Sequence, residues 1–466
     1  MLFNNSLRSG IFPNSWKKSY VFPVFKKGDK CIISNYRGIA ALCAVSKLFE
    51  ITVLDFITHN CSSYISETQH GFMSKRSTST NLVFYTSFIL RSLEARRQVD
   101  AIYTDFSAAF DKINHQIAVA KLERLGFSGS FLYWLQSYLT GRETAVKIGD
   151  CLTSSFSITS GVPQGSHLGP FIFLLYLNDL NFSLDCMKLS FADDFKLFHV
   201  IRSPDDASFL QTQLDILTYW CNKNMMVLNA MKCSVISFTR KRSIFTHNYS
   251  ISQTVLKRET VVKDLGILLD SKLSFKDHIE YIISKASKLL GFIFRVAKDF
   301  ANIYCLKALY CALVRSTLEY AAVVWAPYYQ TDILRIEAIQ RKFIRFALRR
   351  LPWTDRQNLP SYRDRCKLIN LDLLSIRRDA SKAIFIADLL QSRIDCPELL
   401  QLLNVNIQRR NLRFHPFLRL PSARTNYGHN EPLTSMCRLF NRCSNSFDFH
   451  LSRDATRNLF VRALSS

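Results

Sequence analysis

The chain has 466 residues, 48% of them hydrophobic, which allows a large core and several subdomains and excludes a disordered tail protein. Lysine and arginine total 61 against 37 aspartates and glutamates, so the formal net charge is +24 and a polyanionic partner such as nucleic acid is expected. A membrane is the weaker candidate, because the apolar run 171–177 between Pro170 and Asn178 is far shorter than the roughly 20 residues of a spanning helix.

Thirteen cysteines lie between Cys31 and Cys443, an odd number with no Cys-x-x-Cys pair. This pattern argues against a disulfide framework and against a zinc site of the usual spacing. The N-terminus has no basic patch followed by an apolar stretch and a small-residue cleavage site. An intracellular setting, in nucleus or cytoplasm, is therefore expected, with no membrane partner.

The first predicted strand is the apolar stretch Tyr20–Phe25, which leads into the basic turn Lys26-Lys27-Gly28-Asp29. A second strand is expected over Ala101–Phe106, a β-prone run that is followed by helical periodicity as far as Leu125. This assignment puts Asp105 at the end of a strand.

Two hairpins are expected next along the chain. The first pairs Thr144–Ile148 with Phe156–Thr159, two alternating runs with Gly-Asp between them. The second pairs Lys188–Ala192 with Phe195–Val200 and carries Asp193-Asp194 at its tip. The two acids would then stand beside hydrophobic strands.

The rest of the chain is predicted to be mainly helical. Ser203-Pro204 has the N-cap and first-turn chemistry of a helix that runs toward Lys223. Pro352, Pro360 and the polar residues between them mark a break, after which the sequence predicts no clear fold. Beyond about residue 275, helical apolar spacing occurs in His278–Phe294, Ile303–Arg315 and Ile333–Leu348.

The acids at the strand ends suit one kind of chemistry. A lone Asp-Asp pair is most often a solvated turn, but acids beside a core require a metal or a cation. Phosphoryl transfer to a nucleotide uses two Mg²⁺ ions about 4 Å apart, and a few carboxylates suffice because water and phosphate supply the other ligands. Asp105, Asp193 and Asp194 provide such a set.

Several motifs carry a family resemblance. Phe191-Ala192-Asp193-Asp194 resembles the Tyr/Phe-x-Asp-Asp hairpin of reverse transcriptases, and Thr104–Asp111 resembles the LDLSKAFD motif of LINE-type (non-LTR) retrotransposons, particularly the jockey and I-like groups. Ser160–Ser166 with Leu168–Pro170 resembles their SGVPQGSxLGP loop. Further resemblances, which together span roughly residues 12–350, lie at Asn35–Arg37, Gln69–Phe72, Leu228–Lys232, Leu265–Ile267 and Leu318–Pro327.

The resemblance implies a right-hand polymerase of the α+β class. It implies fingers over residues 1–100, a palm with the acids over 101–272, and a helical thumb over 273–350. Residues 351–466 would form a basic C-terminal region of unknown fold. The implied activity is RNA-directed DNA polymerisation with dNTPs, an RNA template and a DNA primer or RNA–DNA hybrid, using two Mg²⁺ ions or Mn²⁺ as a substitute.

The resemblance also implies roles for single residues. Asp105 and Asp193 would hold both metal ions with Asp194 beside them, and Phe110 would block a ribose 2′-hydroxyl. Without the resemblance, Phe110 is a core residue, Gln164 orders a loop and the lysines are solvated charges. The residues implied to contact the nucleotide are Lys26 or Lys27, Arg37, Phe110, Gln164, Gly165 and Lys232.

A basic stripe is expected on the last predicted thumb helix. Arg341, Arg345 and Arg349 follow one another at intervals of four, with Lys342 beside them. Such a stripe can follow a phosphate backbone, although a run of charge is more often a solvated helix face. The interleaved apolar residues indicate an amphipathic helix, so phosphate contact is the favoured interpretation.

Two alternatives to an active polymerase remain open in the sequence. Gly38 replaces a proline of the family pattern and His167 an aliphatic residue, which is compatible with a decayed RNA-binding remnant of the same fold. A basic structural nucleic-acid-binding protein is the other rival. The Leu7–Trp16 segment already resembles the entry to the fingers, and His415, His429 and His450 lie far apart, so a truncated copy without endonuclease activity is expected.

Overall fold

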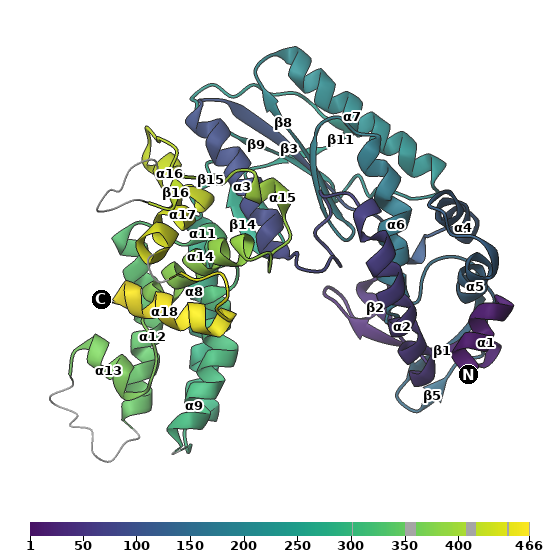
Figure 1. Ribbon diagram of the computed structural model, residues 1–466, viewed down its shortest axis with the longest axis horizontal. Helices are drawn as coiled ribbons and strands as arrows, with labels where there is room; N and C mark the ends of the chain where they lie inside the picture. The colour runs from purple at the N-terminus through teal and green to yellow at the C-terminus, as the bar shows by residue number, and fades with distance from the viewer. Residues whose placement is uncertain (301, 350–359, 407–415, 445–446, 466) are drawn as a thin grey trace.

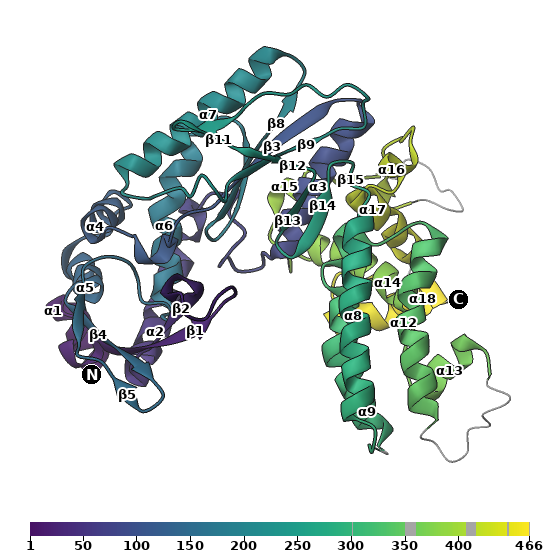
Figure 2. The same cartoon turned by 180° about the vertical axis from the view of Figure 1, so that it is seen from behind.

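The computed structural model of the protein describes residues 1–300, 302–349, 360–406, 416–444 and 447–465. Two arms extend from a central sheet, one carrying the N-terminus and the other the C-terminus (Figures 1 and 2). Helices and sheets occur together in one body, which confirms the predicted α+β class. No helix in the described ranges combines the length and apolar character needed to cross a membrane.

The central sheet has five strands in the order β12-β9-β3-β8-β7, and β3 runs antiparallel to both β8 and β9. Both faces are covered: Ile102 and Leu197 join one core with α6 and α7, whereas Ala101 and Phe198 join the other with α3. The elements are β3 (Gln98–Thr104), β7 (Met187–Phe191), β8 (Asp194–Ile201), β9 (Ser234–Phe238), β12 (Lys257–Glu259), α3 (Thr78–Glu94), α6 (Leu168–Phe182) and α7 (Pro204–Lys223).

The arm with the N-terminus is built on a second sheet in the order β2-β1-β4-β5, with β6 also paired to β4. β1 pairs in parallel with β4, so Tyr20 lies opposite Ala145. This sheet therefore combines residues 18–41 with residues 142–158, and the bounds implied for fingers and palm stay predictions. The elements are α1 (Leu2–Ser9), β1 (Lys18–Phe25), β2 (Tyr36–Ala41), α2 (Ala44–Cys61), α4 (His115–Arg124), α5 (Gly129–Leu139), β4 (Arg142–Ile148), β5 (Cys151–Leu152) and β6 (Phe156–Ile158).

The other arm is helical. α8 lies on the side nearest the first arm and α12 on the far side, as both views show (Figures 1 and 2). Its elements are α8 (Lys276–Val296), α9 (Ile303–Leu309), a π-helical turn (Tyr310–Arg315), α10 (Ser316–Glu319), α11 (Ala322–Trp325) and α12 (Gln330–Leu348). The hairpin of β13 (Val261–Asp264) with β14 (Ile267–Asp270) leads from the central sheet into α8. A second small hairpin, β10 (Ser250–Ile251) with β11 (Thr254–Val255), lies between β9 and β12 in the chain and contacts α7.

The C-terminal region, for which the sequence predicts no clear fold, is largely helical and packs on this arm. Its helix α14 contacts α17 and α18, and Glu94 of α3 accepts hydrogen bonds from Arg424 and Thr425. The expected break lies outside the described residues except for Pro360. The elements are α13 (Tyr362–Leu368), α14 (Leu374–Leu390), α15 (Pro397–Leu400), β15 (Asn404–Val405), β16 (Leu418–Arg419), α16 (Asn426–His429), α17 (Pro432–Cys443) and α18 (Arg453–Ser465).

Local sequence chemistry accounts for several of these elements. Ser203 caps α7 in a capping box with Asp206, and Pro204 is its first residue, as predicted. Gly126 follows α4 with φ 96°, a conformation that glycine adopts without strain. All thirteen cysteines are free thiols, which agrees with the predicted lack of a disulfide framework.

Candidate active site

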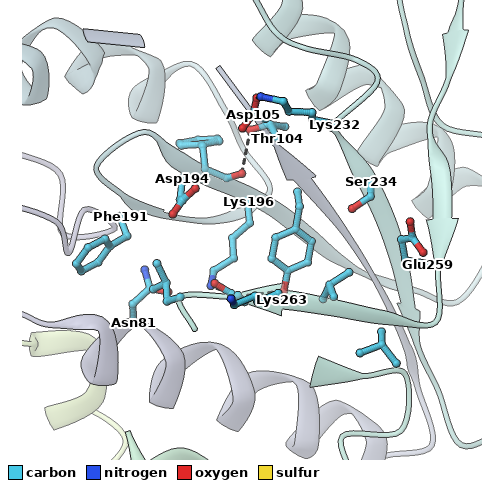
Figure 3. Close-up of a pocket in the computed structure, with 16 residues that line it drawn as sticks. Asn81, Thr104, Asp105, Phe191, Asp194, Lys196, Lys232, Ser234, Glu259 and Lys263 are labelled. Carbon is cyan, nitrogen blue, oxygen red and sulfur yellow. Dashed lines mark hydrogen bonds and ion pairs between the residues drawn. The ribbon is translucent and has the colours of Figure 1, made fainter. Parts of the chain in front are cut away.

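The three predicted acids lie at the ends of adjacent strands. Phe191 pairs with Asp194 across the β7–β8 hairpin, so Ala192 and Asp193 form its turn. Thr104 pairs with Phe195, which places Asp105 just beyond the end of β3 and beside Asp194. Asp105 and Asp194 line one cavity of about 400 Å³, and Figure 3 shows Lys232 next to Asp105 at its rim. The predicted hairpin thus brings the acids together.

Gln69 and Gly71 hold the turn of this hairpin. The Gln69 side-chain oxygen accepts hydrogen bonds from the backbone of Gly71 (2.7 Å) and of Ala192 (3.1 Å). A Cβ at residue 71 would lie 2.3 Å from the Ala192 nitrogen, so only glycine allows this approach. His70 adds a backbone bond to Ser190 (3.0 Å), which explains the Gln69–Phe72 motif as a support for the acids.

Burial, together with neighbouring like charges, raises the pKa values of Asp193 and Asp194. The Asp194 side chain opens onto the cavity. Its pKa is raised to about 6, mainly because its contact with solvent is restricted and also because Asp193 and Asp264 carry like charges nearby. Partial burial also raises the pKa of Asp193, and Arg37 partly opposes this effect. Clustered carboxylates of this kind favour a bound cation or a proton, and they occur at functional sites.

Asp105 is the third acid and has a different environment. Its side chain is 40% exposed, and Lys232 Nζ lies 3.3 Å from Oδ2. That oxygen is buried and makes no hydrogen bond within the described ranges, so Lys232 neutralises it without bonding to it. The backbone carbonyl of Asp105 accepts from Asn229 (2.8 Å), and this bond anchors the turn that carries Lys232.

The donor set at this edge of the sheet fits Mg²⁺. Among the described residues, no three His, Cys, Asp or Glu side chains form a preformed metal cluster. Magnesium does not require one, because it keeps several waters and takes one or two carboxylates together with substrate phosphates. The unbonded Oδ2 of Asp105 and the clustered carboxylates of Asp193 and Asp194 are oxygen donors of the required kind.

Phe110 and the glycine-rich loop over 160–166 pack together. The Phe110 ring stacks on Phe173 at 4.4 Å, and its carbonyl accepts from Val162 (2.9 Å). Gln164 Nε2 donates to Asp111 Oδ1 at 2.7 Å. Phe110 and Gln164, two residues predicted to contact the nucleotide, therefore lie close together. The hydrogen bond from Gln164 to Asp111 also orders the loop.

The same loop contacts the strand that carries Arg37. The Gln164 carbonyl accepts from the Ala40 backbone (2.8 Å), and a Cβ at Gly165 would lie 2.7 Å from the Ala40 oxygen. Arg37 is exposed on β2, and its charge opposes part of the rise in the pKa of Asp193 that burial causes. Lys26 and Lys27 are exposed at the end of β1.

Neither departure from the family pattern disturbs the local structure. The His167 side chain is exposed, and only its backbone N–H is used, donating to the buried Glu50 Oε2 at 2.8 Å. Gly38 pairs with Pro23 in the first sheet, where a Cβ would lie 2.8 Å from Val21 Cγ1. These positions thus give no structural reason for an inactive fold.

The exposed basic residues of the helical arm lie on two helices. Lys342 and Arg345 on α12, and Arg349 directly after it, are exposed, but the Arg341 guanidinium stacks 4.6 Å above the Tyr362 ring. The predicted stripe did not include a second set on α8, the helix nearest the first arm (Figure 1). Spacings of three and seven residues along one helix could have identified this set: Lys285, Lys288 and Arg295, all exposed.

The chain is similar in sequence to RNA-directed DNA polymerases of mobile elements. A probable RNA-directed DNA polymerase from transposon X-element of Drosophila melanogaster is 27% identical over 356 residues, 74% of this chain and 39% of that protein. The RNA-directed DNA polymerase from mobile element jockey of the same organism is 26% identical over 369 residues, 76% of this chain and 40% of that protein. The chain spans about two fifths of the length of these relatives.

Among solved structures, telomerase from Candida albicans with a fragment of telomeric RNA matches at a TM-score of 0.42 and 12% identity, over 77% of this chain and 66% of that one. Residues 24–294, more than half of the chain, match the family described as reverse transcriptase (RNA-dependent DNA polymerase). The predicted resemblance to jockey-type elements is confirmed, and the chain belongs to the reverse transcriptase family.

Proposed function

We propose that this chain is an RNA-directed DNA polymerase of a non-LTR retrotransposon. It extends the 3′-hydroxyl of a DNA primer or RNA–DNA hybrid on an RNA template, with dNTPs as substrates. The observation that carries the proposal is the set of carboxylates Asp105, Asp193 and Asp194 at adjacent strand ends, of which Asp105 and Asp194 line one cavity. Family membership and the net charge of +24 support it.

Asp105 and Asp193 would hold two Mg²⁺ ions, or Mn²⁺ as a substitute, with Asp194 beside them. These ions would neutralise charge on the reacting phosphates. Arg37 and Lys26 orient the triphosphate, since a guanidinium gives a bidentate fork and an ammonium a point charge. The ammonium group of Lys232 lies at the rim of the cavity, beside Asp105, where it can meet a phosphate. Phe110 closes the space at the sugar, and Gln164 with Gly165 orders the loop beneath it.

Primer extension by the purified chain on an RNA template tests the proposal. We expect incorporation of dNTPs that depends on Mg²⁺ and stops when EDTA is added. RNA binding without any incorporation would contradict it and favour a non-catalytic remnant of the same fold.

Metal binding should depend on pH through Asp194. The pKa of this carboxyl is raised to about 6 in the folded chain. Protonation of Asp194 therefore stabilises the folded chain at low pH, and this stabilisation is lost as the pH rises from about 4 through 6. Mg²⁺ can replace the proton only where the carboxyl is ionised. We therefore expect Mg²⁺ to raise Tm more at pH 7.5 than at pH 5, as thermal unfolding would measure.

Two variants control this experiment. Asp194→Asn should remove most of the pH dependence of the Mg²⁺ shift, whereas Asp150→Asn, at an exposed turn, should leave it unchanged. Equal shifts at both pH values in the wild type would show that Asp194 is not part of the metal site.

Nucleic-acid contact by the thumb should appear in the salt dependence of binding. We propose that the exposed cations of α8 and those of α12 both bind phosphate, with α8 contributing more because it faces the first arm (Figure 2). Neutralising Lys285, Lys288 and Arg295 to glutamine should reduce the slope of log K against log salt by roughly two to three units.

The matched triple variant on α12, with Lys342, Arg345 and Arg349 changed to glutamine, should reduce the slope by less. Arg341 is left intact there because its stacking on Tyr362 is a packing contact. Binding of a template–primer duplex is measured by fluorescence anisotropy at several salt concentrations. An unaltered slope in both variants would make the two stripes solvated helix faces.

A further inference from the structure

The β13–β14 hairpin borders the active-site cavity but forms a two-stranded sheet of its own. Its turn is Leu265-Gly266, with φ of 43° and 91°. At its base, Ser271 donates to the Thr260 carbonyl and Thr239 donates to the Ser271 carbonyl, both at 3.0 Å. An isolated hairpin is only marginally stable, so side chains must fix the position of its tip.

Two side chains hold this turn: the Tyr320 hydroxyl donates to the Leu265 carbonyl at 3.0 Å, and Asp264, next to the turn, makes a buried set of contacts. Lys196 Nζ lies 2.5 Å from Asp264 Oδ2, and the Tyr103 hydroxyl donates to the same oxygen at 3.1 Å. Lys196 and Asp264 are each only 5% exposed. The ammonium also lies 4.2 Å above the Tyr85 ring, whose hydroxyl is 3.0 Å from that of Tyr103. A charge pair buried this deeply is stable only when further polar contacts satisfy its remaining hydrogen-bonding groups.

The partners of Asp264 come from the two strands that carry the acids. Lys196 is two residues after Asp194 on β8, and Tyr103 is two residues before Asp105 on β3. Residues two apart on a strand share a face, so these side chains project on the cavity side. Figure 3 shows Lys196 extending from its strand toward Lys263 of the hairpin. One carboxylate thus joins three elements around the cavity.

We propose that Lys196 and Asp264 are positioning residues for nucleotide transfer, which hold the β13–β14 hairpin in register with the acid-bearing strands. The inference rests on the proposed polymerase function. Apolar contacts would also bury this space, but they are not directional and permit sliding. The ion pair and the Tyr103 hydroxyl specify one position. Shifts of about 1 Å at a reacting centre can reduce rates by about 10²-fold.

The double variant Lys196→Met with Asp264→Val separates positioning from stability. Apolar residues of similar volume commonly replace a buried ion pair without loss of stability, so the variant should melt close to the wild-type Tm. The net charge near Asp194 is also unchanged, so the Mg²⁺ dependence should persist. We expect kcat for single-nucleotide incorporation to fall by about tenfold to 10²-fold. The KM for dNTP should change little.

A second pair of variants covers the case in which the double variant does not fold. Tyr103→Phe removes one hydrogen bond to Asp264, and Tyr249→Phe removes one of 2.9 Å to the buried Asp100, from a site outside the cavity lining. Each loses one tyrosine–aspartate bond, and Tyr103→Phe also loses the contact with the Tyr85 hydroxyl, which is on α3 and not on the hairpin. Only the first variant loosens the hairpin. Tyr103→Phe should lower kcat severalfold, and Tyr249→Phe should leave it unchanged.

Hydrogen–deuterium exchange of residues 261–270 tests the tether without any reaction. Exchange there should accelerate at least tenfold in the double variant and increase in Tyr103→Phe, with no change in Tyr249→Phe. Wild-type exchange together with wild-type kcat in the double variant would overturn the inference. A wild-type chain that incorporates no nucleotide would instead contradict the proposed function, and the exchange data would still decide whether the tether exists.

Discussion

Replacing Asp193 with asparagine is expected to abolish primer extension while RNA affinity stays nearly unchanged. The amide keeps the shape of the side chain but removes the negative charge that a divalent ion needs. The loss should be about three orders of magnitude or more, beyond the roughly 10²- to 10³-fold effect of deleting one oxyanion donor. Asp105→Asn should act in the same way, although it also releases Lys232 from its ion pair.

Incorporation rates and RNA dissociation constants are measured on the same preparations. Asp150→Asn serves as the matched control, since it removes a carboxylate from an exposed turn between β4 and β5. RNA affinity should persist because the acids contribute none of the cations that bind phosphate. Near wild-type extension by either active-site variant would refute the metal assignment.

Phe110→Ala is expected to weaken discrimination against ribonucleotides by on the order of 10²-fold. The ring stands beside Asp111 and the 160–166 loop, so its removal opens space where a 2′-hydroxyl would otherwise collide. The same change deletes the stack on Phe173. Because Phe110 is only partly buried, the accompanying loss of stability should be about 2 kcal/mol, below the range for fully buried phenylalanines.

The measurement is the ratio of kcat/KM for a dNTP to that for the matching rNTP. Phe173→Leu is the control, because it disturbs the packing beneath Phe110 but leaves the blocking ring in place. A ratio that is unchanged in Phe110→Ala would assign this side chain to packing alone.

The parts of the structure that follow local patterns were predictable from the sequence. The acid-bearing hairpin was expected over 188–200 and occurs as Met187–Phe191 with Asp194–Ile201. The helix after Ser203 begins at Pro204 and ends at Lys223, as its N-cap and its periodicity indicate. Period-two alternation, turn residues and caps act over a few positions, so a single sequence contains them.

Contacts between distant segments were not predictable in this way. Lys196 interrupts a strand that is buried on both faces, which signals that it needs a partner, but nothing local identifies Asp264 as that partner. Helix α14 was missed because its buried residues, Arg378, Lys382 and Asp388 among them, surround the helix and obscure the apolar stripe. The roles of the individual site residues stay predictions until the variants above are measured.

The parallel pairing of β1 with β4 has a consequence for synthesis on the ribosome. Lys18 of β1 lies opposite Glu143 of β4, so β1 has no β4 partner until more than 120 further residues have been synthesised. Until then β1 can pair only with β2, and the edge of residues 18–21 that later meets β4 stays open. Loop closure over such a separation is slow, and the nascent arm is prone to aggregation in that interval. The first strand to be made therefore cannot take its final place in the sheet until Ile148, the last residue of β4, has been made.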